Sequence, residues 1–489
     1  MLQRLNFYNV FFLLVVAALT VAFIYAISRT GMYLQEEIYV AASFHEYLLF
    51  LIIPLFCLIT LYIFSIFSRE AAKYYIFCFT VSIFGAFYAA ELYYFVTDKG
   101  DYHDPRRHGL KQAAKELGVP FDERNFNEVL SDLRRDHPSL LINYSQSALA
   151  KIPPSGIDGI QSPTGLIRPL GNVSNSRILA CNESGEWITM DNDEHGFNNP
   201  RGLFAKDSID ILLVGDSFTQ GYCVKQDETI AGHLRKLGLN VISLGIGGNG
   251  PLTALASIAE YARYLRPKFV IYNYFEKNDL IDLGSLERKS EILLSYLNPN
   301  FLQRLYERQD EIDTILLTFL KRIERINVQR QEQARLEARR TKTFRESEFF
   351  KWMKLTRLRG KLIGGWPGAP EQWNPYTFEP DLDLFRRAIQ ASKERSEKVG
   401  ARYFVAYLPE WDRYGYDRVD DKALYHRGDV LEILQDLDVP VIDFLNRIKA
   451  FPDPLAIFPF RKDAHYNSTG YGELADQIFT VITEQQKKQ

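Results

Sequence analysis

Hydrophobic and polar positions follow two different patterns along the chain. Residues 5–28 and 47–68 contain no charged side chain, and residues 74–97 contain only Glu91. At about 1.5 Å per residue, a helix of such length crosses a hydrocarbon core about 30 Å thick. Residues 1–97 carry only nine of the 58 Lys and Arg and 61 Asp and Glu side chains. We therefore predict a membrane region, residues 1–97, with three transmembrane helices.

From residue 208 onward, short apolar runs alternate with amphipathic segments. The sequence IDILLVG at 209–215 is typical of a strand buried on both faces. Strands that alternate with helices predict a parallel sheet covered by helices on both sides. We expect a three-layer α/β/α fold of the flavodoxin-like type in residues 208–489. Its strands are predicted at 209–215, 240–244, 268–274, 403–408 and 439–443, and its helices at 229–237, 252–265, 382–399, 430–437 and 469–482.

Two further regions break this alternation. Residues 98–207 predict a linker and small satellite subdomain, with helical patterns at 109–117 and 126–135 and two strands within 176–199 joined by a turn at 183–185. Residues 284–375 predict a helical insertion. In it the apolar residues Leu305, Ile312, Phe319 and Ile326 recur every seven positions, with Ile315, Leu316 and Ile323 between them. Three heptads are few for a coiled coil, so we expect this helix to pack on its own domain.

Charge and composition exclude several classes of function. A net charge of −3 provides no basic surface to replace the counterions of nucleic acid, so no nucleic-acid partner is expected. We find no spacing of Cys or His that is typical of a metal site, and we expect neither a metal nor a cofactor. The basic residues that flank the predicted spans divide almost equally between the two orientations in the membrane.

The chain has four cysteines, and two of them, Cys181 and Cys223, lie outside the predicted spans. If they form a disulfide, the soluble part belongs in an oxidising compartment. Two unrelated buried thiols would explain them equally well. We expect the soluble part on the extracytoplasmic side, periplasmic or outer, of a multi-pass membrane protein.

Residues able to do chemistry follow the predicted strands. Ser217 follows the first strand, the glycine-rich segment 245–250 follows the second, and Asn278 follows the third. Asp463 and His465 precede the last helix. Each alone has an ordinary structural explanation, such as a helix cap for Ser217. Because ligands of open parallel sheets bind beyond the carboxyl ends of the strands, the combination predicts a site there.

In this order, the blocks G-D-S at 215–217, the glycine after strand two, N-D at 278–279 and D-x-H-x-N at 463–467 resemble the SGNH, or GDSL-type, family of esterases and acyl hydrolases. The resemblance covers about 208–283 and 376–482. It departs from the family at Glu276, where a glycine is common, and in the shortened D-x-H spacing. The shortened spacing is similar to that of relatives acting on bacterial exopolysaccharide.

The resemblance implies roles that suit acyl transfer. Ser217 is the expected nucleophile, His465 the base that takes its proton, and Asp463 the acid that orients the imidazole. The expected oxyanion donors are the backbone N–H groups of Ser217 and Gly248 and the side-chain amide of Asn278.

Three functions agree with this expectation. The first is a membrane-anchored serine ester hydrolase that removes O-acetyl or similar acyl groups from a cell-surface glycan. The second is an O-acyltransferase that uses the same triad on an exopolysaccharide, with a membrane acyltransferase or polysaccharide-assembly proteins as partners. The third is a non-catalytic glycan-binding or assembly protein. Expected partners are the lipid bilayer and an acylated carbohydrate.

Overall fold

The structure is a computed structural model that describes residues 7–35, 53–97, 105–151, 158–340 and 378–487. The chain divides into two compact units, Met1–Gly100 with Glu332–Trp373, and Asp101–Gln331 with Asn374–Gln489. The end of the first stretch lies close to the expected end of the membrane region at residue 97. Most of the second half of the predicted insertion, including its Gly/Pro-rich segment at 364–370, lies outside the described residues.

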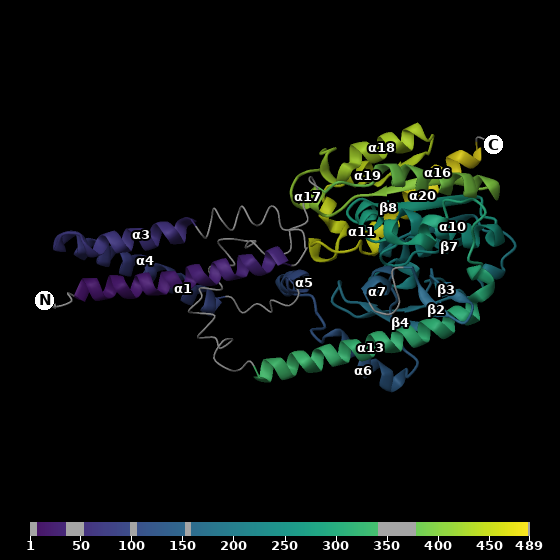
Figure 1. The fold of residues 1–489 in the computed structure, drawn as a ribbon. Coiled ribbons are helices and arrows are strands. Elements are labelled where there is room, and N and C mark those ends of the chain that lie inside the picture. Colours follow the sequence, from purple (N-terminus) through teal and green to yellow (C-terminus); the bar gives the residue numbers. More distant parts are fainter. Residues whose placement is uncertain (1–6, 36–52, 98–104, 152–157, 341–377, 488–489) are drawn as a thin grey trace. The chain divides into compact units, whose positions relative to one another are not determined.

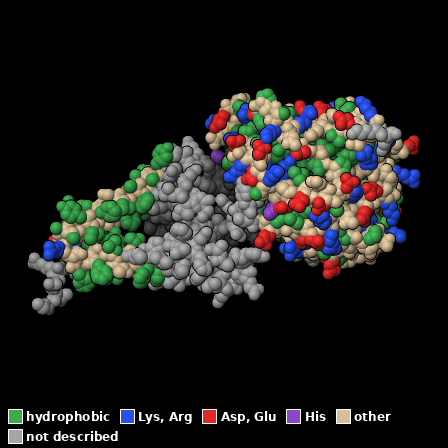
Figure 2. All heavy atoms as spheres, turned by 90° about the horizontal axis from the view of Figure 1, so that it is seen from above, with side chains coloured by type: hydrophobic (Ala, Val, Ile, Leu, Met, Phe, Trp, Pro, Cys, Tyr) green, Lys and Arg blue, Asp and Glu red, His purple; other side chains and the backbone are tan. Residues whose placement is uncertain are grey.

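The first unit contains three helices at the positions of the predicted spans: α1 (Phe7–Gln35), α3 (Ile53–Ile66) and α4 (Glu70–Thr97). Large apolar side chains cover its visible face, whereas charged side chains are spread over the second unit (Figure 2). Within the described residues, one helical segment, Glu70–Tyr93, is long and apolar enough to cross a bilayer, and Phe7–Thr20 is apolar but shorter. Three complete membrane crossings therefore remain a prediction.

The second unit is built on a five-stranded, wholly parallel sheet (Figure 1). Its order is β10-β9-β8-β6-β7, which is 2-1-3-4-5 in chain order, the flavodoxin-like arrangement. The predicted α/β fold with a parallel sheet is confirmed. The strands are β6 (Ile211–Gly215), β7 (Val241–Ser243), β8 (Phe269–Phe275), β9 (Arg402–Leu408) and β10 (Val441–Asp443).

Alternate side chains of each central strand enter different hydrophobic cores. In β6, Leu212 and Val214 belong to one core and Ile211 and Leu213 to the other, because successive side chains of a strand point to opposite faces. One core lies on each face of the sheet and is covered by helices, so the domain has the predicted three layers, helices, sheet and helices. On the first face lie α10 (Pro251–Leu265), α16 (Leu382–Lys398) and α18 (Arg427–Asp436); on the second lie α9 (Ile230–Lys236), α19 (Phe444–Lys449) and α20 (Ser468–Lys487).

The satellite region shares the first of these cores. The predicted hairpin within 176–199 is confirmed: β4 (Arg177–Cys181) and β5 (Ile188–Asp191) pair antiparallel, with β1 (Leu141–Ile142) on the other side of β4. Its other elements are α5 (Pro105–Glu116), α6 (Phe126–Asp136), α7 (Gln146–Lys151), β2 (Ile160–Ser162) and β3 (Gly165–Ile167).

The insertion also packs on this domain. Its long helix α13 (Gln309–Arg340) runs beside α6 and the satellite strands (Figure 1). The predicted apolar stripe enters the first core, since Ile312, Phe319 and Ile323 are buried there and Ile326 packs against it. Packing on its own domain is thus confirmed for this helix. Short helices connect the remaining segments: α8 (Ser217–Gln220), α11 (Asp279–Ser285), α12 (Glu291–Ser295) and α17 (Asp412–Gly415).

Candidate active site

Ser217 is the first residue of α8 and lies two residues beyond the end of β6. Gly215 ends the strand at φ +148°, and a Cβ there would lie 2.7 Å from the Asn273 carbonyl oxygen, so this turn requires glycine. Asp216 caps the short helix, because its Oδ1 accepts a hydrogen bond of 2.9 Å from Phe218 N–H. β6 lies between β7 and β8, which is where the strand order reverses. Such reversal points are where ligands bind in open α/β sheets.

The structure brings Ser217 and His465 together, as expected. Ser217 Oγ lies 2.9 Å from His465 Nε2, which is within hydrogen-bonding distance. The imidazole is only 13% exposed and packs against the rings of Phe218 and Tyr222. A base in this position can take the serine proton as the oxygen attacks a carbonyl carbon.

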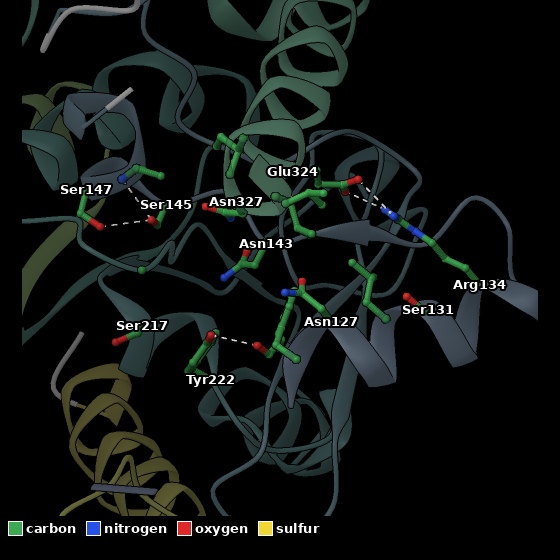
Figure 3. Close-up of a pocket in the computed structure, with 18 of the residues that line it drawn as sticks. Asn127, Ser131, Arg134, Asn143, Ser145, Ser147, Ser217, Tyr222, Glu324 and Asn327 are labelled. Carbon is green, nitrogen blue, oxygen red and sulfur yellow. Dashed lines mark hydrogen bonds and ion pairs between the residues drawn. The ribbon is translucent and has the colours of Figure 1, made fainter. Parts of the chain in front are cut away.

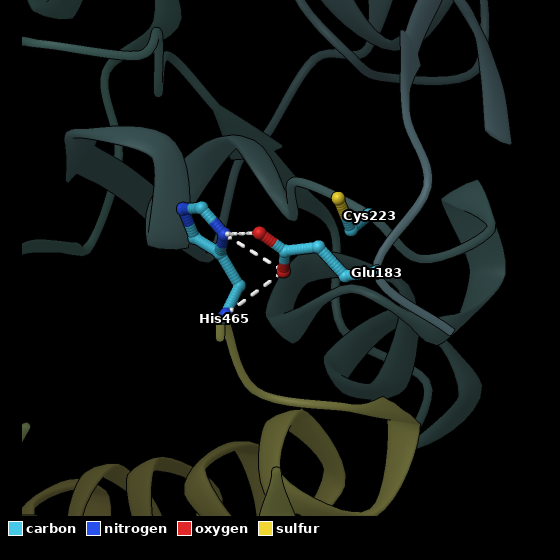
Figure 4. Close-up of side chains that lie close together, drawn as sticks. All are labelled: Glu183, Cys223 and His465. Atoms are coloured by element: carbon cyan, nitrogen blue, oxygen red, sulfur yellow. Dashed lines mark hydrogen bonds and ion pairs between the residues drawn. The ribbon is translucent and has the colours of Figure 1, made fainter. Parts of the chain in front are cut away.

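The acid beside His465 is Glu183, so the expectation that Asp463 fills this place is wrong (Figure 4). Glu183 Oε1 and Oε2 lie 3.0 and 3.1 Å from His465 Nδ1, and Oε2 also accepts a 2.9 Å hydrogen bond from the His465 backbone N–H. The Asp463 carboxylate is instead 3.3 Å from Lys277 Nζ and 44% exposed. Glu183 lies in the turn between β4 and β5, so the satellite supplies the carboxylate that contacts Nδ1.

Charges around Glu183 keep its carboxyl group ionised. Burial alone raises the pKa of Glu183, but the charge and hydrogen bonds of His465, together with Arg106, outweigh burial and lower this pKa to about 2. The guanidinium of Arg106 lies 2.8 Å from Glu183 Oε1, and its Nε donates a 3.0 Å hydrogen bond to the Asp463 carbonyl oxygen. Arg106 thus joins Glu183 to the loop that carries His465.

A disulfide connects the segment that carries Glu183 to the segment that carries Ser217. Cys181, at the end of β4, is bonded to Cys223, and the two Cα atoms are 5.5 Å apart. Of the two explanations that the sequence left open for these cysteines, the structure shows the disulfide. Cys181 lies two residues before Glu183 and Cys223 six residues after Ser217, so the bond ties the two segments together. Glu183, Cys223 and His465 lie close enough to suggest metal ligands, but the Cys223 sulfur is already used in the disulfide.

The expected oxyanion donors lie around the same loop ends. Ser217 is the first residue of α8, so its N–H has no acceptor within the helix. Gly248 has φ +81°, and within the described residues its N–H meets no acceptor, whereas Gly247 N–H donates to Gln220 Oε1 at 3.1 Å. The Asn278 amide donates to Asp216 Oδ2 at 3.2 Å, which fixes its orientation and leaves its second hydrogen for a substrate. The oxyanion roles remain a prediction.

Glu276, which departs from the family pattern, has a structural role. Its oxygens lie 2.7 Å from Arg413 Nε, both side chains are fully buried, and Tyr407 also donates to it. A buried carboxylate is stable only when paired in this way. The residue therefore holds the loop after β9 rather than replacing an oxyanion donor.

A pocket of about 730 Å³ opens beside Ser217 and His465 (Figure 3). Its walls come from the satellite and the insertion: α6 contributes Phe126 and Asn127, the segment after β1 contributes Asn143, and α13 contributes Glu324 and Asn327. This volume lies in the range of ligand sites, about 300 to 1,000 Å³. These lining residues could not be recognised in the sequence, because half-buried or exposed polar residues such as Asn127, Glu324 and Asn327 are ordinary on amphipathic helices.

The chain is only weakly similar to known proteins. No family model and no curated protein matches the chain. Among solved structures it is similar to a putative acylhydrolase from Bacteroides fragilis, at 13% identity over 57% of this chain and 89% of the other, with a TM-score of 0.29. An acetyl xylan esterase is also 13% identical, over 56% of this chain and 100% of the other, again with a TM-score of 0.29. A GDSL-like lipase from Bacteroides thetaiotaomicron is 11% identical over 56% and 87%, with the same score. With such scores, the function must be argued from the site itself.

Proposed function

We propose that the protein is a serine ester hydrolase of the SGNH type, with Ser217 as nucleophile, His465 as base and Glu183 as acid. The observation that carries this proposal is the chain of contacts from Ser217 Oγ to His465 Nε2 and from His465 Nδ1 to Glu183. Serine, imidazole and carboxylate in this order form the arrangement that makes a hydroxyl nucleophilic near neutral pH.

The reaction follows from these positions. Ser217 Oγ attacks the ester carbonyl carbon while His465 Nε2 takes its proton, and Glu183 stabilises the imidazolium that forms. The tetrahedral oxyanion lies near the Ser217 and Gly248 N–H groups and the Asn278 amide. The ester C–O bond then breaks, and the leaving alcohol takes the proton from Nε2. Water, activated by the same imidazole, next hydrolyses the acyl-enzyme and releases the carboxylic acid.

We further propose that the substrate is an O-acylated glycan at the cell surface. The apolar helices of the first unit support a membrane anchor, and the Cys181–Cys223 disulfide supports an oxidising, extracytoplasmic compartment. Alkaline carbonate should leave the protein in the membrane pellet, and detergent should release it. Release by carbonate alone would contradict the anchor.

Acyl transfer to a sugar hydroxyl is the second candidate, because the pocket beside Ser217 has room for an acceptor as well as for a small acyl group. Both reactions pass through the same acyl-enzyme. Incubation of the enzyme with 4-nitrophenyl acetate and a sugar acceptor distinguishes them: hydrolysis yields acetate, and transfer yields the acetylated sugar.

The decisive experiment is labelling of the detergent-solubilised protein with a fluorophosphonate. We expect the wild type to be labelled and the Ser217→Ala variant not to be. Ser145→Ala, which removes a hydroxyl from the wall of the pocket, is the matched control and should still be labelled. A folded wild-type protein that resists labelling and does not hydrolyse 4-nitrophenyl acetate would refute the proposed function.

A further inference from the structure

Three side-chain amides from separate elements line the pocket beside Ser217. Asn127 lies on α6, Asn143 follows β1, and Asn327 lies on α13 (Figure 3). Hydroxyl groups of Ser131, Ser145 and Ser147 also line it. Amides and hydroxyls offer both donors and acceptors without charge, which is what a polyhydroxylated ligand needs.

The orientation of Asn143 is fixed by buried neighbours. Its Oδ1 accepts hydrogen bonds from Asn172 Nδ2 at 3.2 Å and from Gln220 Nε2 at 3.4 Å, and both of these residues are almost fully buried. Asn172 is held in turn, because its Oδ1 accepts a 2.7 Å hydrogen bond from Tyr144 N–H. With Oδ1 occupied, Nδ2 is the remaining polar atom of Asn143, and it lies beside the hydroxyl of Tyr222, another lining residue (Figure 3). A donor held in this way loses little conformational entropy when a ligand oxygen accepts from it.

The two permanently charged residues of the pocket neutralise each other. Arg134 NH1 and NH2 lie 3.1 and 2.7 Å from the two oxygens of Glu324, and Arg134 Nε donates to the Leu140 carbonyl oxygen at 2.8 Å. A ligand carboxylate that formed an ion pair with Arg134 would leave Glu324 without its partner. The two side chains are 30% and 25% exposed and already paired, so this wall offers an anionic ligand no unpaired cation.

Apolar side chains complete the lining. Phe126 and Leu130 on α6 and Ile323 on α13 lie among the amides. A pyranose ring presents C–H groups on its faces and hydroxyls on its edge, so a wall of this mixed kind suits it better than a wholly polar wall would.

We propose that this pocket binds an uncharged sugar of the acylated glycan, recognised by the amides of Asn127, Asn143 and Asn327. The inference rests on the proposed function and names the substrate class of the same site. The paired charges of Arg134 and Glu324 offer a uronic acid no unpaired cation, and a long acyl chain would leave the amides of Asn127, Asn143 and Asn327 without hydrogen-bond partners.

The test compares two sugar esters that differ only at C6: a mono-O-acetylated methyl glucoside and the corresponding methyl glucuronoside. We expect kcat/KM to be at least tenfold higher for the glucoside. Asn127→Ala and Asn327→Ala should each lower kcat/KM for the glucoside ester about fivefold to tenfold, the loss expected for one hydrogen bond, and should lower it less for 4-nitrophenyl acetate. The matched control is Arg325→Ala, an exposed change on α13 outside the pocket lining, which should leave both rates as they are.

Other outcomes separate this inference from the proposed function. Hydrolysis of 4-nitrophenyl acetate with equal rates on both sugar esters, or with a preference for the glucuronoside, would overturn the sugar assignment alone. Faster hydrolysis of 4-nitrophenyl decanoate than of the acetate would also overturn it. If the wild type hydrolyses none of the esters, saturation-transfer NMR with the Ser217→Ala protein can still test whether the pocket binds the sugar. Signal from the glucoside but not from the glucuronoside supports the inference, and any other result overturns it.

Discussion

Glu183 accepts hydrogen bonds from both the ring Nδ1 and the backbone N–H of His465, although 282 positions separate the two residues in the chain. The Glu183→Gln variant should therefore keep its fold but lose kcat by about 10³ to 10⁴, because the amide neither stabilises the imidazolium nor fixes its tautomer. Steady-state hydrolysis of 4-nitrophenyl acetate measures this loss.

The control for Glu183 is Asp463→Asn. Its carboxylate contacts Lys277 and not His465, so this change should reduce kcat less than tenfold. If Asp463→Asn were the more damaging of the two changes, the assignment of the acid would be reversed.

Arg106 competes with His465 for the same carboxylate. Its positive charge helps to lower the pKa of Glu183, so Arg106→Ala should raise that pKa and make the carboxylate easier to protonate. We expect the acidic limb of the pH profile of kcat/KM to move to higher pH by up to about one unit. Arg106→Lys keeps the positive charge, so its acidic limb should lie close to that of the wild type. Arg107→Ala, at the neighbouring position on α5, should leave the profile in place. An unmoved acidic limb in Arg106→Ala would show that the ion pair is only structural.

The depressed pKa of Glu183 predicts how stability depends on pH. Burial opposes ionisation, but His465 and Arg106 lower the pKa of Glu183 from 4.5 to about 2. The stabilisation is therefore fully present above about pH 4.5 and is lost as the pH falls toward 2. Thermal unfolding at pH 6, 4 and 3 should show a smaller decrease in Tm for Glu183→Gln than for the wild type. Glu186→Gln, which changes an exposed residue of the same turn, should behave like the wild type.

The disulfide holds the acid against the segment after the nucleophile. It closes a separation of 42 residues, for which the chain-entropy model gives about 4 kcal/mol of stabilisation. The double variant Cys181→Ser/Cys223→Ser should unfold at lower urea and lose kcat beyond the loss of folded protein. A reducing agent should affect the wild type in the same way and leave the double variant unchanged. Equal urea midpoints for the two proteins would contradict the prediction.

Asn278 offers a test of the oxyanion site. Asp216 fixes the orientation of its amide, so Asn278→Ala should lower kcat by about 10² to 10³ with little change in KM. Asn446→Ala, which removes an exposed amide far along the chain, is the control. A change confined to KM would place Asn278 in substrate binding instead.

The sheet could be predicted from the sequence because its strands are short apolar runs with helices between them. The proximity of Ser217 and His465 was also predicted, and the Cys181–Cys223 disulfide was one of two explanations left open. The acid was not predicted, because Glu183 is an ordinary turn residue whose role depends on how the satellite folds against the sheet. The disulfide contained the missing signal: pairing Cys181 with Cys223 places the adjacent turn near Ser217. The pocket walls could not be predicted, since they depend on α6 and α13 meeting across more than 180 residues.

The proposed acid, nucleophile and base occur in the chain in the order Glu183, Ser217 and His465. Glu183 and Ser217 are translated well before His465, so a nascent chain can form the sheet edge and even close the disulfide while the serine still lacks its base. On the proposed function, the site is therefore complete only once the loop that carries His465 has folded against Ser217 and Glu183.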